Sequence, residues 1–435
     1  MYLLRPERVL FYGWMVWLSF LIISPYDYYN LGNFVYSIVT LFLFNISLVL
    51  GMKSNRFALK RTKLKPIVFN SNISKLLIMT TILSIVGSIL YIYTKLEIIG
   101  SINFSSLASN KIEIFKAGEQ ANSLLKALSV FLHPFSIVSF ILLIYFRNNF
   151  SRTKFLIILS LSLITVFFQL ILGSRTLLFF YFFLGLIVMV ISPKSHLRHN
   201  LVSFTFKSLF SKISKRVIIL CFLALIGVFK IFTWIQDDRL ESMGGDNVSF
   251  FNYWAEGQQW NYNSDHPINF LMTEHPSYYS GGLNFIHYQV HGVYEYSRNI
   301  SHLGNPEGTY YGAYELYPII KLLNFIGFES KLSDIEMNKV VLRHGVYSTF
   351  WGPFYIDFGL FGIVVIFFIG RLITKIYNSF YRSKSILIML LYPYLLTVIF
   401  FSPILNLFTG SFIYMFISIL LVGIVMKTIK IKHSN

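Results

Sequence analysis

Ten long apolar runs constrain the fold of this chain more than any other feature of its sequence. Most are close to the roughly 20 residues that an α-helix needs to cross a hydrocarbon core about 30 Å thick. Continuous apolar runs favour helices, because an unpartnered backbone amide in lipid costs several kcal/mol. We therefore predict an all-α polytopic membrane protein with about ten transmembrane helices, near residues 9–24, 31–51, 76–94, 124–146, 155–173, 177–192, 217–235, 350–370, 385–402 and 408–426.

Composition agrees with this prediction. Hydrophobic residues make up 55% of the chain and charged residues only 13%, whereas a soluble domain carries roughly 25% charged residues. The net charge of +18 would suggest nucleic acid as a partner of a soluble chain. Here the basic residues fall between the apolar runs and form no stripe with interleaved aromatic residues, so we expect membrane lipids and no nucleic acid as partners.

The charges between the runs predict the orientation of the helices. With both termini in the cytoplasm, the cytoplasmic segments carry 25 of the 37 Lys and Arg residues and only one acidic residue, Glu7. Cytoplasmic loops are enriched in Lys and Arg in membrane proteins. This asymmetry places residues 25–30, 95–123, 173–176, 236–345 and 403–407 on the opposite, non-cytoplasmic side of the membrane.

The segment 236–345 differs from the rest of the chain. It holds 13 acidic residues, 11 tyrosines and six of the ten histidines. We expect three parts: helices 1–7 in residues 1–235, a large non-cytoplasmic loop in 236–345 that caps the bundle, and helices 8–10 in 346–435. Within the loop, residues 313–328 and 331–343 have the spacing of helices.

The sequence lacks the common motifs of metal and phosphate chemistry. No phosphate-binding Gly loop, HExxH motif or GxSxG elbow occurs, and the single cysteine, Cys221, excludes an intramolecular disulfide. Asp237 and Asp238 resemble acidic pairs that hold metals, but nothing nearby supplies further ligands and a solvated helix end explains them better. We expect no metal and no cofactor.

Arginines at the non-cytoplasmic ends of the helices are the strongest candidates for binding an anion. Arg175, Arg239 and Arg343 should lie at one depth, at the external membrane interface where a lipid diphosphate would place its phosphates. A guanidinium binds phosphate oxygens in a fork and would stabilise a departing diphosphate. The alternative is that these side chains anchor helix ends. Arg298, inside the loop, is either functional or solvated.

Other candidates are an intramembrane carboxylate, a histidine and loop aromatics. A carboxylate within a span usually has a partner or a task, and Lys230 is one possible partner for Asp357. His344 is the first candidate for a general base, ahead of His291 and His266. The flat faces of Trp254 and Trp260 suit sugar rings, unless they belong to an interfacial aromatic belt.

Four features together resemble a known family: the GSRT turn at 173–176, the large loop after the seventh run, ELYP at 315–318, and VYSTFWGPFYIDFGLFG at 346–362. They are similar to the oligosaccharide repeat-unit polymerases of O-antigen synthesis, the Wzy family, and the architecture resembles GT-C-like glycosyltransferases. The resemblance implies a bacterial inner membrane, with the non-cytoplasmic side and the active site facing the periplasm. The similarity covers residues 150–370. The arginine-x10-glycine motifs of some members are absent, because no glycine lies eleven positions after Arg175, Arg298 or Arg343.

The resemblance implies a reaction between two undecaprenyl-diphosphate-linked glycans. A hydroxyl of the acceptor's distal sugar attacks the reducing-end anomeric carbon of the donor chain, and undecaprenyl diphosphate leaves. Arg175, Arg239 and Arg343 would then bind the diphosphate, and Arg298 would bind the second lipid or the sugar. His344 or a loop carboxylate would take the proton, while Tyr347 and Asp357 would lie near the site.

A chain-length regulator is an expected partner of such a polymerase. Two alternatives remain open from the sequence. An O-antigen ligase would use the same donor and a similar large loop, whereas a lipid-linked glycan flippase or other transporter should have charged residues in a cavity at the membrane midplane.

Overall fold

The computed structural model is mostly helical in the part of the chain that it describes. That part comprises residues 4–54, 67–102, 110, 114, 124–172, 176–192, 226–227, 230, 234, 260–263, 265–269, 276–303, 310–325, 327, 340–341, 348–383, 385–408 and 412–428. Of the ten predicted spans, the seventh, 217–235, lies almost entirely outside these residues, and so does most of the predicted helix 331–343.

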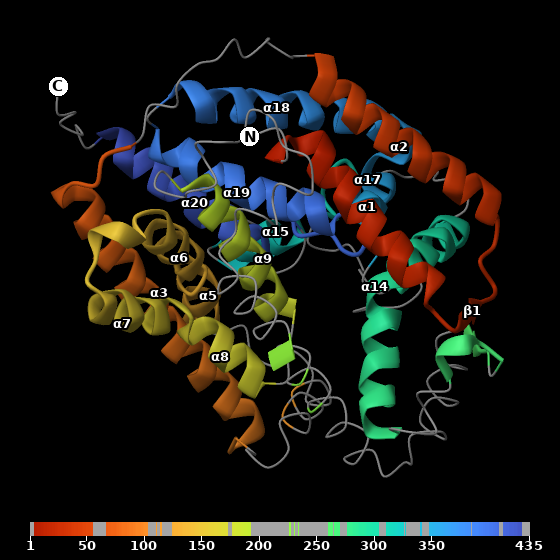
Figure 1. Cartoon of the computed structure of the whole chain (residues 1–435), viewed down its shortest axis with the longest axis horizontal. Helices are drawn as coiled ribbons and strands as arrows, with labels where there is room; N and C mark the ends of the chain where they lie inside the picture. Colours follow the sequence, from red (N-terminus) through yellow and green to blue (C-terminus); the bar gives the residue numbers. More distant parts are fainter. Residues whose placement is uncertain are drawn as a thin grey trace.

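The first half of the chain forms helices at the predicted apolar runs (Figure 1). They are α1 (Pro6–Ile22), α2 (Phe34–Ser54), α3 (Ser71–Ile99), α5 (Leu124–Leu132), α6 (Phe135–Tyr145), α7 (Arg152–Ser162), α8 (Ile164–Ile171) and α9 (Thr176–Ile191), with a 3-10 turn at Arg147–Asn149. The predicted span 155–173 is bent by 43° between α7 and α8.

The second half continues with α14 (Pro276–Leu303), α15 (Tyr317–Phe325), α17 (Trp351–Phe358), α18 (Gly362–Arg382), α19 (Ile386–Phe401) and α20 (Phe412–Thr428), with 3-10 turns at Pro267–Asn269 and Gly359–Phe361. The predicted loop helix 313–328 is therefore shorter in the structure. Two short strands, β1 (Tyr26–Tyr28) and β2 (Trp260–Tyr262), form one antiparallel pair.

Several of these helices match the thickness of a membrane. By length and composition, four described segments are long and apolar enough to cross one: Phe34–Ser54, Ser71–Ile99, Leu124–Tyr145 and Trp351–Arg382, or five when α7 and α8 count as one bent span. Helices α9, α19 and α20 are apolar but shorter. The protein is thus an all-α membrane protein in its described part, while the count of ten spans stays a prediction.

Helices α2 and α18 pack closely along their lengths, and Figure 1 shows them side by side at one edge of the bundle. Glycines permit this approach: a Cβ atom at Gly51 would collide with the carbonyl oxygen of Phe367, and one at Gly370 with that of Leu48. Small residues allow helix backbones to approach in membrane interfaces, where packing rather than water exclusion holds helices together. The contact fixes α18, and with it α17, against the N-terminal helices.

Segments that the charge pattern assigns to the periplasmic side contact one another in the structure. Strand β1, in the turn between α1 and α2, pairs with β2 from the large loop in the register Tyr26↔Tyr262 and Tyr28↔Trp260. The backbone N–H of Phe350 donates to the carbonyl of Ser402 at 2.9 Å, which joins the start of α17 to the connection between α19 and α20. Residues 260–262 of the loop therefore contact the turn between α1 and α2, and the start of α17 contacts the connection between α19 and α20.

Candidate functional site

The structure describes only part of the predicted site. Arg298 and Asp357 are described in full, and Trp260 by its backbone, which pairs with Tyr28. The remaining predicted residues lie outside the described part of the chain: Arg175, Arg239, Trp254, Arg343, His344 and Tyr347. Their roles stay predictions. In the described part of the chain, the candidate site consists of the charged and aromatic side chains that surround Arg298 and Asp357.

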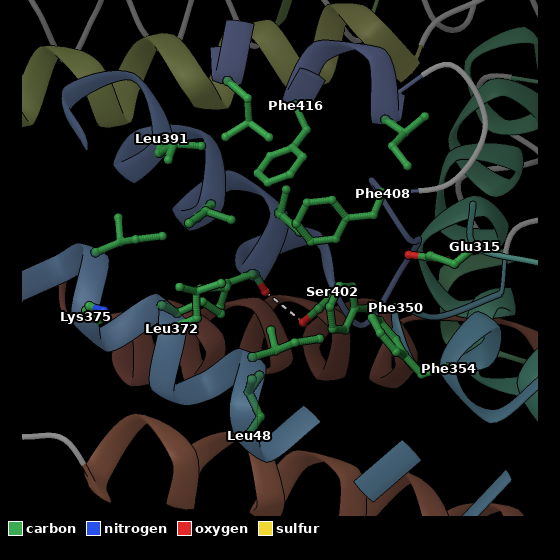
Figure 2. A pocket seen from close by; sticks show the side chains of 18 of the residues that line it. Leu48, Glu315, Phe350, Phe354, Leu372, Lys375, Leu391, Ser402, Phe408 and Phe416 are labelled. Carbon is green, nitrogen blue, oxygen red and sulfur yellow. Dashed lines mark hydrogen bonds between the residues drawn. The ribbon is translucent and has the colours of Figure 1, made fainter. Parts of the chain in front are cut away.

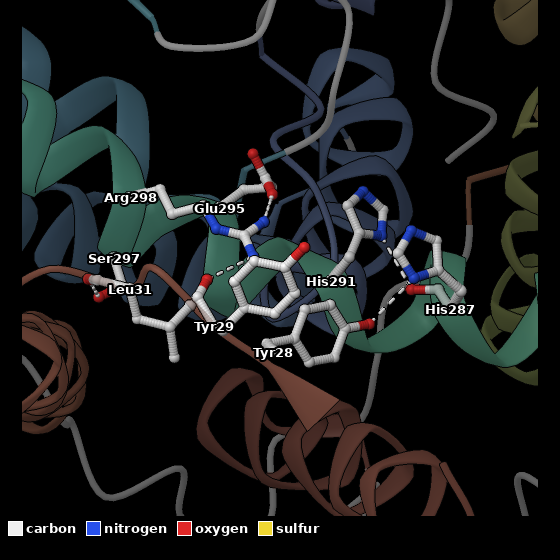
Figure 3. Close-up of polar contacts among 8 residues, drawn as sticks. All are labelled: Tyr28, Tyr29, Leu31, His287, His291, Glu295, Ser297 and Arg298. Carbon is white, nitrogen blue, oxygen red and sulfur yellow. Dashed lines mark hydrogen bonds and ion pairs between the residues drawn. The ribbon is translucent and has the colours of Figure 1, made fainter. Parts of the chain in front are cut away.

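Arg298 lies on α14 and is buried, with 2% of its surface exposed. Its Nη1 atom donates to the Glu295 Oε1 atom at 2.6 Å, and Nη2 donates to the carbonyl of Tyr29 at 2.9 Å (Figure 3). The guanidinium carbon lies 5.9 Å from the centre of the Tyr28 ring. A buried charge requires such partners. In the structure Arg298 therefore ties α14 to the turn between α1 and α2 and is not solvated.

Burial also acts on the ionisation of this arginine. Loss of water lowers the pKa of the Arg298 guanidinium to about 10, and the neighbouring Tyr28 and Tyr29 oppose this shift. The group therefore keeps its positive charge at neutral pH, and the Glu295 carboxylate balances it. The predicted contact of Arg298 with a sugar or a second lipid stays a prediction.

Two histidines form a stacked pair one turn before this ion pair. The rings of His287 and His291 lie 5.0 Å apart between centres and 16° from parallel. The Nδ1 atom of His291 lies 2.9 Å from the carbonyl oxygen of His287, which only accepts hydrogen bonds, so Nδ1 carries the hydrogen. Nε2 is then the nitrogen that accepts a proton.

Tyr28 lies in the turn between α1 and α2, to which Arg298 is hydrogen-bonded, and it also contacts the histidine pair. Its hydroxyl lies 3.0 Å from Nδ1 of His287, and its ring stacks on Tyr294 at 3.8 Å. Figure 3 shows Tyr28 between the histidines and the Arg298 guanidinium. His266, the other candidate base, lies in the turn after β2, where Nδ1 accepts from the backbone of Ile268 at 3.3 Å.

Asp357, on α17, is fully buried. Its two carboxylate oxygens accept hydrogen bonds from the backbone N–H groups of Tyr314 and Glu315, each at 2.9 Å, and its own carbonyl accepts from Tyr311. Backbone donors compensate the loss of water around a carboxylate. Lys230, which the sequence offered as a partner, is exposed. The observed contacts give Asp357 a structural task, because it holds the turns that precede α15.

Glu315 is a second buried carboxyl group in the same cluster, with 8% of its surface exposed. The Nδ2 atom of Asn406 lies 3.1 and 3.2 Å from its two oxygens and 3.2 Å from the carbonyl of Phe350. Burial raises the pKa of Glu315 to about 8, Asn406 opposes the shift, and Asp357 adds to it. The group is therefore largely protonated at neutral pH and exchanges its proton close to physiological pH.

Sequence reasoning did not single out Glu315, Asn406 or His287. Glu315 stands in the ELYP segment, yet its carboxyl group accepts a hydrogen bond from Asn406, 91 residues later in the chain. The i, i+4 spacing of His287 and His291 is visible in the sequence and was the available signal. Among the described residues, no group of three or more His, Cys, Asp or Glu side chains is arranged to hold a metal ion.

The buried charged side chains of the described residues lie in segments near one predicted side of the membrane. Glu295, Arg298, Glu315 and Asp357 are the four buried Asp, Glu, Lys or Arg side chains among the described residues, and all belong to segments near the predicted periplasmic side. Comparisons with protein-family models, with curated proteins and with solved structures find no match to this chain.

Proposed function

We propose that the protein polymerises undecaprenyl-diphosphate-linked oligosaccharide repeat units into O-antigen polysaccharide on the periplasmic face of the inner membrane. The growing chain on one lipid diphosphate is the donor. A hydroxyl oxygen on the distal sugar of a single lipid-linked unit attacks the donor's reducing-end anomeric carbon. A new glycosidic C–O bond forms, the anomeric C–O bond to the diphosphate breaks, a base takes the hydroxyl proton, and undecaprenyl diphosphate is released.

One observation about the buried Asp, Glu, Lys and Arg side chains of the described residues supports this proposal most. Glu295, Arg298 and Glu315 lie in the loop 236–345, and Asp357 lies on α17 where it contacts that loop. A transporter that moves polar cargo through the bilayer needs such groups near the midplane. A transferase that works on lipid-linked sugars at the membrane surface needs them at one end of the bundle. The similarity of residues 346–362 to the O-antigen polymerases suggests which class of reaction takes place at that side of the membrane.

The roles within the proposed site follow the resemblance and general chemistry. Arg175, Arg239 and Arg343 would bind the diphosphate and stabilise it as it leaves, because converging guanidinium groups offset developing negative charge. His344 would take the proton of the attacking hydroxyl. Glu315 is a further candidate, since its pKa of about 8 suits proton transfer near neutral pH.

A gene deletion tests this function in the organism that carries the gene. We expect lipopolysaccharide with a single repeat unit on its core, because ligation would continue without polymerisation, and complementation should restore a ladder of long chains. Long chains that persist in the clean deletion would overturn the proposal. Loss of every capped core, including the single unit, would indicate a ligase.

Variants test the proposed residues in the same strain. Arg175→Ala, Arg239→Ala, Arg343→Ala and His344→Ala should each shorten or abolish the ladder while the protein remains in the membrane. Lys53→Ala is a matched control, because Lys53 is exposed at the predicted cytoplasmic end of α2. Wild-type ladders from all four variants would remove the site assignment.

A further inference from the structure

A large apolar cavity lies among α18, α19 and α20, apart from the histidine and arginine cluster on α14. Its volume is about 490 Å³, within the range of about 300–1,000 Å³ of typical ligand pockets. Leu391, Leu395, Val398 and Phe416 are among the side chains that line it (Figure 2). The Ser402 hydroxyl adds little polarity, because it donates to the Ile399 carbonyl at 2.7 Å.

The shape of the cavity suits one extended hydrocarbon chain. It is lined along α19 from Ile388 to Ile399, and eleven residues of α-helix rise about 16 Å. Half of a hydrocarbon core about 30 Å thick is roughly 15 Å, so the cavity has about the depth of one membrane leaflet. Leu372 lines the cavity and is 54% exposed, which places an opening at the outer face of α18.

Only two ionisable groups line the cavity among the described residues, Lys375 and Glu315, and Figure 2 shows them at opposite ends. Lys375 is exposed and Ser379 follows one turn later on α18. These two side chains offer an ammonium group and a hydroxyl, which are suitable partners for a phosphate. Among the described residues that line the cavity, no Lys, Arg or His side chain lies at the Glu315 end, so the Lys375 end suits a phosphate better.

We propose that the cavity binds an anionic glycerophospholipid, with one acyl chain inside it and the phosphate of the headgroup beside Lys375 and Ser379. The position of Lys375 agrees with this orientation of the lipid, because residues 371–384 carry four basic residues and belong to the predicted cytoplasmic side. Anionic lipids are attracted to basic residues at that surface. The lipid is distinct from the lipid-diphosphate substrates of the proposed polymerase, whose phosphates would lie at the opposite side.

Native mass spectrometry on the delipidated full-length protein tests this site. The probes are dioleoylphosphatidylglycerol and dioleoylphosphatidylcholine, added separately. We expect one tightly bound phosphatidylglycerol and weaker binding of phosphatidylcholine. Lys375→Ala should weaken phosphatidylglycerol about fivefold, the effect expected for loss of one basic residue near a membrane surface.

Two further variants separate the headgroup contact from the acyl-chain contact. Arg371→Ala is the matched control, since Arg371 is exposed on the same helix but does not line the cavity, and it should bind like wild type. Leu372→Trp narrows the opening and should weaken both lipids. Equal binding of the two lipids, unchanged binding by Lys375→Ala, or retention of a polyprenyl phosphate or diphosphate instead of a phospholipid would each overturn the proposal.

Discussion

Asn406 donates to both carboxyl oxygens of Glu315, at 3.1 and 3.2 Å, and so joins the connection between α19 and α20 to a loop segment 91 residues earlier. The contact explains how a carboxyl group is accommodated at the edge of an apolar cavity. Burial favours the neutral form of an acid. The burial of Glu315 therefore makes the stability of the protein depend on pH.

The sign of this dependence follows from the pKa of Glu315, which rises from its ordinary 4.5 to about 8 in the folded protein. The folded state keeps a proton that the unfolded chain releases, so this contribution to stability is complete below about pH 4.5 and is lost as pH rises to 8. The slope is at most about 1.4 kcal/mol per pH unit. Glu315→Gln removes the titration and should unfold at a higher temperature than wild type at pH 9, with a smaller difference at pH 6.

Thermal unfolding of both proteins in detergent at the two pH values measures this difference. Asp265→Asn is the control, because Asp265 is exposed in the turn after β2. Parallel changes of wild type and Glu315→Gln between pH 6 and 9 would show that Glu315 does not titrate in this range.

The Glu295–Arg298 ion pair should be costly to break from one side. Glu295→Ala leaves the buried guanidinium without its carboxylate, and such a loss typically costs about 3–5 kcal/mol. Replacing both residues, by Glu295→Leu with Arg298→Met, should cost less than Glu295→Ala alone. A double-mutant cycle compares the unfolding temperatures of Glu295→Leu, Arg298→Met and the double mutant, and so measures the coupling between the two residues. His302→Ala is the control, because His302 is exposed on the same helix. Additive effects of the two single substitutions would contradict the pairing.

Asp357→Asn tests whether the carboxylate holds the turns before α15. An amide in place of the carboxylate turns one acceptor into a donor that faces a backbone N–H of Tyr314 or Glu315. An unsatisfied buried group costs about 1–3 kcal/mol, so we expect lower thermal stability and a shorter polysaccharide ladder. Asp27→Asn, at an exposed position of β1, should change neither. Full stability of Asp357→Asn would show that the two hydrogen bonds contribute little.

The glycine contact between α2 and α18 should tolerate no larger residue. Gly370→Leu places its side chain against the carbonyl oxygen of Leu48, so the helices must separate and we expect little folded protein in the membrane. Gly185→Ala is a mild control, because its Cβ meets the side-chain ends of Phe140 and Ile144, at 3.2 and 3.6 Å. Size-exclusion chromatography of a fluorescent fusion compares the yields. Equal yields from the two variants would contradict this close packing.

Accessibility of introduced cysteines tests the predicted orientation. The single native cysteine, Cys221, is first replaced by serine. In whole cells with a permeable outer membrane, a membrane-impermeant maleimide should label Asp265→Cys. It should label Lys53→Cys only after the inner membrane is opened. The opposite pattern would invert the topology and move the loop to the cytoplasm.

Helices were predictable from the sequence because lipid leaves few alternatives for a long apolar run. Helices α2 and α3 each occur where such a run was predicted. The predicted run 350–370 corresponds to α17 and the first part of α18, and α18 continues to Arg382 through residues that were predicted to follow the span. The bend between α7 and α8 was not predicted, since residues 155–173 form a predominantly apolar run that contains no proline.

The contacts between distant segments could not be predicted from the sequence. The partners of Asp357 are backbone N–H groups of a loop, and backbone groups leave no mark in the sequence. Arg298 was left open between solvated and functional, because its burial depends on Glu295 and on the distant Tyr29 together. Residue type and spacing predict which groups are costly to bury, whereas their partners follow from the fold.

The most direct test of the proposed function uses the purified protein and its substrate. The protein in lipid vesicles is given undecaprenyl-diphosphate-linked repeat units of the strain that carries the gene, and the products are separated by size. We predict glycans of two or more units on undecaprenyl diphosphate, with one undecaprenyl diphosphate released for each bond formed, and no products with Arg343→Ala. Unchanged single units in the presence of folded wild-type protein would contradict it.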